Sequence, residues 1–127
     1  MNEYEKWADE SQAAWMRRVS MFVAEKVMGW TRVCISTRPA NEVKESGFIW
    51  KDKDGEIAAP WNWNPAELIA DAWLVVEKMW EIGCFHIALI QTDDGYECDF
   101  DDMRDTHSAA ADTAPLAISL AALKAVE

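Results

Sequence analysis

Cysteine and histidine are scarce in this chain of 127 residues, and their spacing forms no metal-binding pattern. Cys34, Cys84 and Cys98 lie far apart without a Cys-x-x-Cys pair, and the two histidines are His86 and His107. This spacing argues against a structural zinc site and against a disulfide framework. We therefore expect no metal, no cofactor, and the buried, reduced thiols of a cytoplasmic protein.

Basic residues are also few, since 12 Lys and Arg face 23 Asp and Glu, for a net charge of −11. Phosphate affinity comes from clustered Lys and Arg, so this balance excludes a broad nucleic-acid-binding face. The excess is uneven: residues 1–63 carry ten acids and nine bases, whereas residues 64–127 carry thirteen acids and three bases. Residues 93–105 alone hold seven acids and one base.

Long apolar runs are missing as well. A stretch such as residues 114–122 is far shorter than the roughly 20 residues that a membrane span needs. The first residues show no basic region followed by an apolar stretch, so we expect no secretory signal. We therefore predict a protein that does not bind a membrane.

Three segments carry apolar residues at helical spacing, over about residues 5–28, 64–82 and 114–126. Asn64, Pro65 and Glu67 form a typical helix start, and Asp112 or Thr113 is expected to cap the third helix. We predict that the middle helix buries one apolar face, formed by Leu68, Ile69, Ala72, Trp73, Val76, Met79 and Trp80. Trp15 of the first helix is expected in the core with Trp73 and Trp80.

Four strands are predicted, at residues 30–35, 48–50, 84–90 and 96–101. The run 84–90 is almost entirely apolar, which is typical of a central strand. Asp93-Asp94-Gly95 predicts a hairpin into the last strand, where Tyr96, Cys98 and Phe100 alternate with acids. We expect loops at residues 36–47, 59–65 and 103–112. The predicted class is α+β, in the order helix-strand-strand-helix-strand-strand-helix, with an antiparallel or mixed sheet covered by helices.

Three blocks of this sequence resemble the phage ABA-sandwich domain, a family of small phage and prophage proteins. The blocks are residues 23–30, residues 71–79, and residues 111–118 together with 121–125. The resemblance implies a three-layer α/β/α sandwich over residues 21–127, with residues 1–20 as an N-terminal helical extension of one domain spanning 1–127. It implies a phage origin, but no settled activity and no catalytic positions.

The sequence favours a non-enzymatic protein. It contains no Gly-x-Ser-x-Gly, no phosphate loop and no Gly-x-Gly-x-x-Gly. His86 lies on an apolar strand, where a lone histidine is typically a packed residue. The acidic segment lacks the glycine and the distal glutamate of a calcium loop, so we interpret its carboxylates as a solvated face.

Eight of the 14 aromatic residues are tryptophans, and four of these lie at strand ends and in loops, where binding residues concentrate. Tryptophan offers a flat face for stacking and an N–H donor. The two helix N-termini at Asn64 and Thr113 could present N–H groups to a phosphate. We therefore predict a ligand pocket lined by Trp30, Arg32, Trp50, Lys51, Trp61, Asn62, Trp63, Asn64 and Thr113. The alternative is that these tryptophans only seal sheet edges or an oligomer interface.

These features favour a phage-encoded binding protein that sequesters a small nucleotide-like host signal in the cytoplasm of the infected bacterium, as an anti-defence sponge. In the alternative, the acidic segment 93–105 forms a protein-interaction module or a nucleic-acid mimic that docks on a basic host protein. Neither hypothesis requires direct nucleic-acid binding, and a homo-oligomer is compatible with both.

Overall fold

The computed structural model describes residues 4–34, 48–60 and 62–127. The loop predicted at residues 36–47 lies outside these ranges. The first half of the chain forms helix α1 (Gln12–Phe22), a π-helical turn η1 (Val23–Val27), and strands β1 (Thr31–Cys34), β2 (Phe48–Lys51) and β3 (Ile57–Pro60). The second half forms α2 (Ile69–Glu81), β4 (His86–Thr92), β5 (Gly95–Asp101), β6 (Thr106–Ala111) and α3 (Ala114–Ala125).

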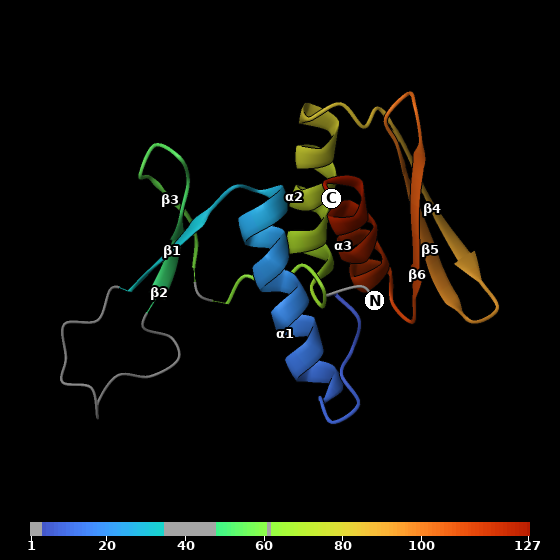
Figure 1. The fold of residues 1–127 in the computed structure, drawn as a ribbon, viewed down its shortest axis with the longest axis horizontal. Coiled ribbons are helices and arrows are strands. Elements are labelled where there is room, and N and C mark those ends of the chain that lie inside the picture. Colours follow the sequence, from blue (N-terminus) through green and yellow to red (C-terminus); the bar gives the residue numbers. More distant parts are fainter. Residues whose placement is uncertain (1–3, 35–47, 61) are drawn as a thin grey trace.

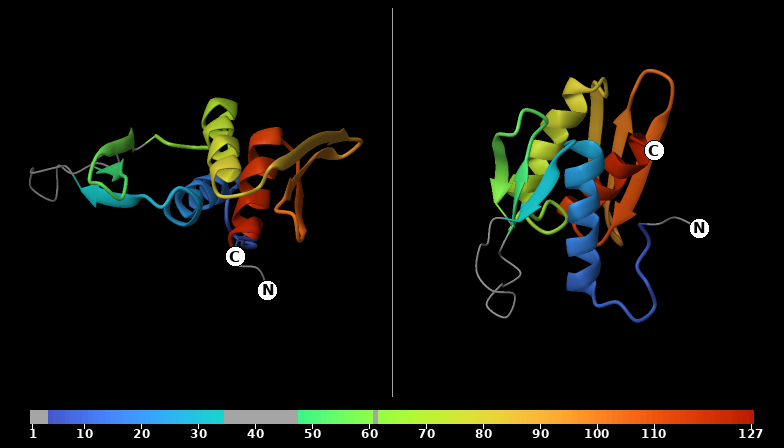
Figure 2. Two further views of the ribbon diagram at one scale, coloured as in Figure 1. Left: turned by 90° about the horizontal axis from the view of Figure 1, so that it is seen from above. Right: turned by 60° about the vertical axis from the view of Figure 1, so that its left-hand side comes forward.

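The helices lie between two antiparallel three-stranded sheets, of order β1-β2-β3 and β4-β5-β6 (Figures 1 and 2). This arrangement confirms the α+β class and antiparallel pairing. It corrects the predicted layering, because helices cover one face of the second sheet instead of both faces of a single sheet. It also corrects the predicted order, because each pair of strands is joined by a third strand.

Helix α3 forms the centre of the core. Seven of its twelve residues are buried: Leu116, Ala117, Ile118, Ser119, Ala121, Ala122 and Leu123. The helix packs against β5, β6, α2, α1 and η1. A helix that is apolar on nearly all sides must be surrounded by other elements, and alanine allows those elements to approach closely. As predicted, Thr113 is the N-cap residue of this helix.

Helix α1 begins later than predicted, because Ser11 caps it by accepting a hydrogen bond from the Ala14 amide at 3.1 Å. Its buried residues, Met16, Val19 and Ser20, continue in η1 with Val23 and Val27. Trp15 is only partly buried against this core. No helix in the described part of the chain is long and apolar enough to cross a bilayer.

Strand β5 carries the predicted alternation. Cys98 and Phe100 are fully buried under α3, and the acids that alternate with them, Glu97, Asp99 and Asp101, point to the other face. The predicted hairpin is also confirmed. Gly95 is required there, because a Cβ at this position would clash with the carbonyl oxygen of Ala111.

Two predictions about this sheet were wrong. Residues 106–111 were expected as a loop, but they form β6 and pair with β5 along its length. The alanine-rich sequence of β6 has low strand propensity, so its pairing with β5 and its cover by α3 decide its structure. The apolar run beginning at Cys84 was expected in the middle of a sheet, yet β4 is an edge strand.

Residues 57–60 form β3, although a loop was predicted from residue 59 onward. Pro60 is the last residue of this edge strand, opposite Ile49 of β2, and proline within sheets is confined largely to edge strands.

Helix α2 differs from its prediction in start and orientation. It begins at Ile69, and residues 64–68 form a separate turn in which the Leu68 amide donates to the Asn64 carbonyl at 2.8 Å. Its buried residues are Ala72, Val75, Val76 and Met79. Trp73 and Trp80 were expected in the core but are 58% and 57% exposed. Apolar residues occupy more than one face of this helix, so periodicity alone cannot identify the buried face.

The central position of α3 makes a specific prediction. Replacing Leu116 by Ala leaves a cavity where α3 meets its neighbours, so we expect the free energy of unfolding to fall by about 2–5 kcal/mol. Chemical denaturation measures the change. Leu68→Ala, at a leucine that is 48% exposed, is the control and should cost under about 1 kcal/mol. Equal losses for both variants would contradict a core centred on α3.

Candidate functional site

Two of the predicted binding tryptophans lie against each other. The rings of Trp30 and Trp63 meet edge to face, with centroids 4.7 Å apart and an interplanar angle of 66°. Trp63 is only 7% exposed, whereas Trp30 is half-buried. The Nε1–H of Trp63 is buried and has no hydrogen-bond acceptor among the described residues. A buried indole N–H usually has a partner, so this donor marks an unusual point in the structure.

Strand register places two more predicted residues close to each other. Arg32 of β1 is directly opposite Trp50 of β2, so the two side chains share one face of the first sheet. Trp50 is 1% exposed and belongs to the core, while Arg32 is exposed. Lys51 follows Trp50 on the same strand and pairs with Thr31, so its side chain points to the opposite face.

A buried serine positions the segment that carries Trp63. Ser20 of α1 donates to Oδ1 of Asn64 at 2.8 Å and accepts a hydrogen bond from the Ala66 amide at 3.1 Å. The Asn64 amide donates to Asp71 at 2.9 Å. These amides were predicted to face a phosphate, but protein oxygens already accept from them. Asn62 is exposed, and Trp61 lies outside the described residues.

Thr113, the last predicted binding residue, is separated from the others by the helices. It is exposed at the start of α3, and α3 lies on the other side of α1 and α2 from the first sheet (Figure 1). The helix starts at Asn64 and Thr113 were predicted to present N–H groups to a phosphate in one pocket. The structure instead brings Trp30 and Trp63 together, with Arg32 and Trp50 on a shared sheet face.

The N-terminal segment is fastened to α1 by an arginine. Arg18 forms a bidentate ion pair with Glu10, with both N–O distances 2.9 Å, and its guanidinium lies 4.0 Å from the Trp7 ring centroid. This pairing lowers the pKa of the Glu10 carboxyl. Tyr4 is buried, and its carbonyl accepts a hydrogen bond from the Trp15 ring at 2.7 Å. Residues 4–10 are therefore an ordered part of the fold.

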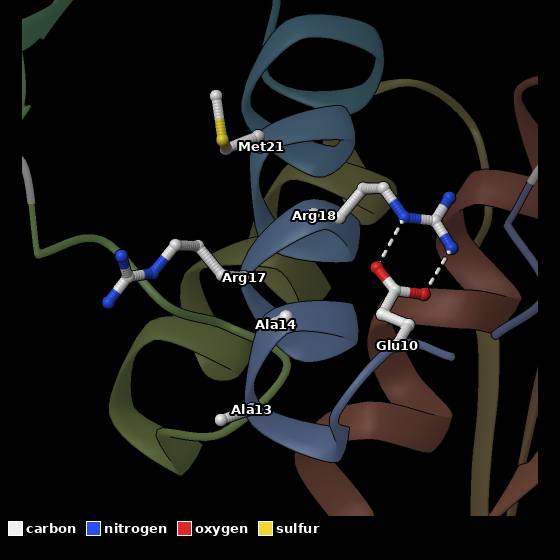
Figure 3. Close-up of a pocket in the computed structure, with 6 residues that line it drawn as sticks. All are labelled: Glu10, Ala13, Ala14, Arg17, Arg18 and Met21. Carbon is white, nitrogen blue, oxygen red and sulfur yellow. Dashed lines mark hydrogen bonds and ion pairs between the residues drawn. The ribbon is translucent and has the colours of Figure 1, made fainter. Parts of the chain in front are cut away.

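Two surface hollows lie beside this segment. The larger, of about 530 Å³, follows the outer side of α1 and is lined by Glu10, Ala13, Ala14, Arg17, Arg18 and Met21 (Figure 3). Arg18 turns toward Glu10, and Arg17 points to the other side. The smaller, of about 290 Å³, lies among the N-terminal segment, β6 and α3. Neither hollow contains any of the nine predicted binding residues.

The described cysteines do not resemble catalytic nucleophiles. Cys84 and Cys98 are both free and buried. Burial, and to a lesser degree Asp99, raises the pKa of Cys98 to about 12, and burial also raises the pKa of Cys84. Reactive cysteines need the opposite shift, because the thiolate is the nucleophile. The side chain of Cys34 lies outside the described part. Within that part, no three His, Cys, Asp or Glu side chains are grouped to hold a metal ion.

One aspartate and one histidine form a close polar pair at the turn between β5 and β6. The carboxylate of Asp102 accepts hydrogen bonds from the amides of Arg104 and Asp105 at 3.0 and 2.9 Å, and lies 3.1 Å from Nε2 of His107. The amide of Asp105, then His107, then the amide of Arg104 lower the pKa of Asp102 to about 2. These hydrogen bonds show that Asp102 and His107 stabilise the turn between β5 and β6.

The acids of β5 form a line on the outer face of the second sheet. Glu97, Asp99 and Asp101 point away from α3, and all three are half-buried because β5 is the central strand. The Oδ1 atom of Asp99 is buried and lacks a hydrogen-bond donor among the described residues. No described helix covers this face.

The comparisons with known proteins agree with this architecture. The family model of the phage ABA sandwich domain matches residues 21–123. The crystal structure of a phage protein from Bacillus cereus ATCC 14579 aligns with a TM-score of 0.60 and 24% sequence identity, covering 96% of this chain and 99% of that chain. At this identity the likeness shows the fold alone. No curated protein matches the sequence.

The low pKa of Asp102 predicts a pH dependence of stability. Its carboxylate stabilises the fold above its ordinary pKa of 3.8, and the contribution is lost as pH falls through about 2. The stability difference between the wild type and Asp102→Asn should therefore shrink from pH 5 to pH 2, as measured by denaturation in urea. Met103→Leu, at an exposed residue of the same turn that does not titrate, should show a constant difference. A constant difference for Asp102→Asn would show that its charge does not stabilise the turn.

Proposed function

Because this chain belongs to the phage ABA sandwich domain family, we propose that it serves a phage by binding another molecule, without catalysing a reaction. The buried thiols with raised pKa values support this view, since they lack the thiolate character of a nucleophile. The Asp102–His107 pair has an evident role in a turn, and no serine, threonine or cysteine is hydrogen-bonded to that histidine in the described part.

One observation carries the proposal for the binding site: the unpaired Nε1–H of Trp63 beside the Trp30 ring. A ligand with a flat ring could stack on Trp30, the more exposed of the two rings, and a shift of the Trp63 side chain would bring its buried Nε1–H within reach of an acceptor on that ligand. Formation of this hydrogen bond would satisfy a buried donor, which favours the bound state over the free state.

The ligand class that fits these requirements is a nucleotide. A nucleobase provides the flat ring and several acceptors, and its phosphate would find a cation in Arg32, on the face that also carries Trp50. We propose that Trp30, Trp63 and Arg32 form this site. Lys51 points to the other sheet face, and Thr113 lies beyond the helices, so we do not place them in it.

A phage protein that binds a nucleotide without consuming it would act by lowering the free concentration of that nucleotide. We propose that the chain sequesters a nucleotide-like signal of the host in the cytoplasm of the infected cell. This proposal demands a dissociation constant near or below the concentration of the signal, and a protein abundance that exceeds it.

Calorimetry and tryptophan fluorescence with AMP, ADP-ribose and cyclic dinucleotides test the proposal. Trp63→Phe keeps an aromatic ring and removes the N–H donor, so we expect roughly tenfold weaker binding. Trp30→Ala removes the stacking surface and should weaken binding roughly 10- to 100-fold. Trp73→Phe, on the exposed face of α2, is the control and should bind as the wild type. The proposal is wrong if none of these nucleotides binds, or if both site variants bind unchanged.

A second candidate function has its own support in the line of carboxylates on β5. Glu97, Asp99 and Asp101 lie on an uncovered sheet face, and Asp99 has a buried oxygen without a donor. A turn of the half-buried Asp99 side chain would let a lysine or arginine of a basic host protein supply that donor, and the acidic half of the chain would attract such a protein.

Binding of a short polylysine peptide tests this candidate. The Asp99→Asn/Asp101→Asn variant should bind the peptide at least about tenfold more weakly, and about 0.5 M salt should abolish binding of the wild type. Asp93→Asn/Asp94→Asn removes the same charge from the exposed hairpin turn and serves as the control. Equal losses in both double variants would show a response to net charge alone and would reject a specific acidic face.

A further inference from the structure

Helix α2 turns a row of apolar side chains away from the core. Ile69, Trp73 and Trp80 are each more than half exposed, and Val76, which is buried, lies on the same line between the two tryptophans. Their spacing of four, three and four residues places them along one line of the helix. Residues with this spacing form the contact line between two helices that pack side by side, whether the helices run parallel or antiparallel.

The row continues onto the second sheet. Trp80 contacts Phe85 edge to face, with centroids 5.5 Å apart. Phe85 stands just before β4, and by strand alternation it shares a face with Ile87 and Leu89. This is the face that carries α3, but β4 is the edge strand, and Phe85 and Leu89 are 52% and 44% exposed.

The resulting apolar surface comprises Ile69, Trp73, Trp80, Phe85 and Leu89, each at least 44% exposed. Side chains of these sizes, exposed to this degree, present on the order of 600 Å². This is the upper end of the roughly 300–600 Å² that the largest apolar patch of a typical monomer covers. Each partner contributes about 800 Å² to a standard protein interface, part of it from a polar rim. The surface can therefore supply the apolar centre of a dimer interface.

The few charges around this surface indicate which class of partner fits it. Glu77 and Glu81 border the row, and Nζ of Lys78 lies 3.8 Å from Oε2 of Glu81. The carboxylates that would attract a basic protein are on β5, on the opposite face of the second sheet. An apolar row with few charges matches another apolar row of the same kind, and a second copy of the chain supplies it in an isologous contact.

We propose that the surface formed by α2 and the start of β4 is the interface of a homodimer, in which the α2 helices of two copies pack against each other. Pairing in antiparallel directions brings Trp73 of one copy near Trp80 of the other, because the two residues are seven positions apart on one line. The copies also repel each other, since each carries a net charge of −11.

Sedimentation equilibrium of the full-length protein tests the proposal. We expect a concentration-dependent dimer whose dissociation constant falls as salt rises to about 0.5 M, because salt screens the repulsion between two acidic chains. Trp73→Glu and Trp80→Glu should each raise the dissociation constant by roughly 30-fold or more. Ile57→Glu, at a residue of β3 that is 71% exposed, should leave the dimer unchanged.

Each outcome bears on the proposal. Both tryptophans are exposed, so the variants should keep the circular dichroism spectrum and melting behaviour of a folded protein. A wild type that stays monomeric at high concentration and high salt overturns the proposal. A dimer that resists Trp73→Glu and Trp80→Glu, or that responds equally to Ile57→Glu, also overturns it, because the interface would then lie elsewhere.

Discussion

The fold depends on the burial of α3 on nearly all of its sides. Its leucines and isoleucine supply apolar contact, and its alanines let neighbouring elements come near. Because α1, η1, α2, β5 and β6 all pack against this one helix, their mutual positions follow from where each can reach it. The two sheets end up on opposite sides of the helices, and they share no strand.

This constraint also explains where sequence patterns succeed and fail. The long helices and one hairpin were predictable: the span of α3, the end of α2 near residue 82, and the hairpin that leads into β5. Strand β6 was not, because alanine, serine and histidine carry no strand pattern, and it becomes a strand only by pairing with β5 beneath α3. The edge position of β4 could not be predicted either. An apolar run indicates that a strand contacts an apolar surface, but it does not show whether that surface belongs to the core of the same chain.

The tryptophans show the same limit for the candidate site. Trp50 and Trp63 were predicted to be exposed because they lie at a strand end and in a loop, but both are buried. Trp73 and Trp80 were predicted to be buried because they lie on a helix, but both are exposed. The contact between Trp30 and Trp63 depends on Ser20, which holds the turn after Trp63 through Asn64 and Ala66. These partners are 44 and 46 residues apart in sequence, a separation at which no local pattern can reveal a hydrogen bond. Sequence could identify a chain rich in indole rings, and only the tertiary structure shows which of them meet.

The contacts that fasten residues 4–10 to α1 make this N-terminal segment part of the folded domain. The family match starts at residue 21, inside α1, whereas Tyr4, Glu10 and Arg18 tie the preceding residues to that same helix. The unit that folds together therefore begins earlier than the region that the family model matches. A chain cut at residue 21 would lose most of α1 together with the residues that are fastened to it.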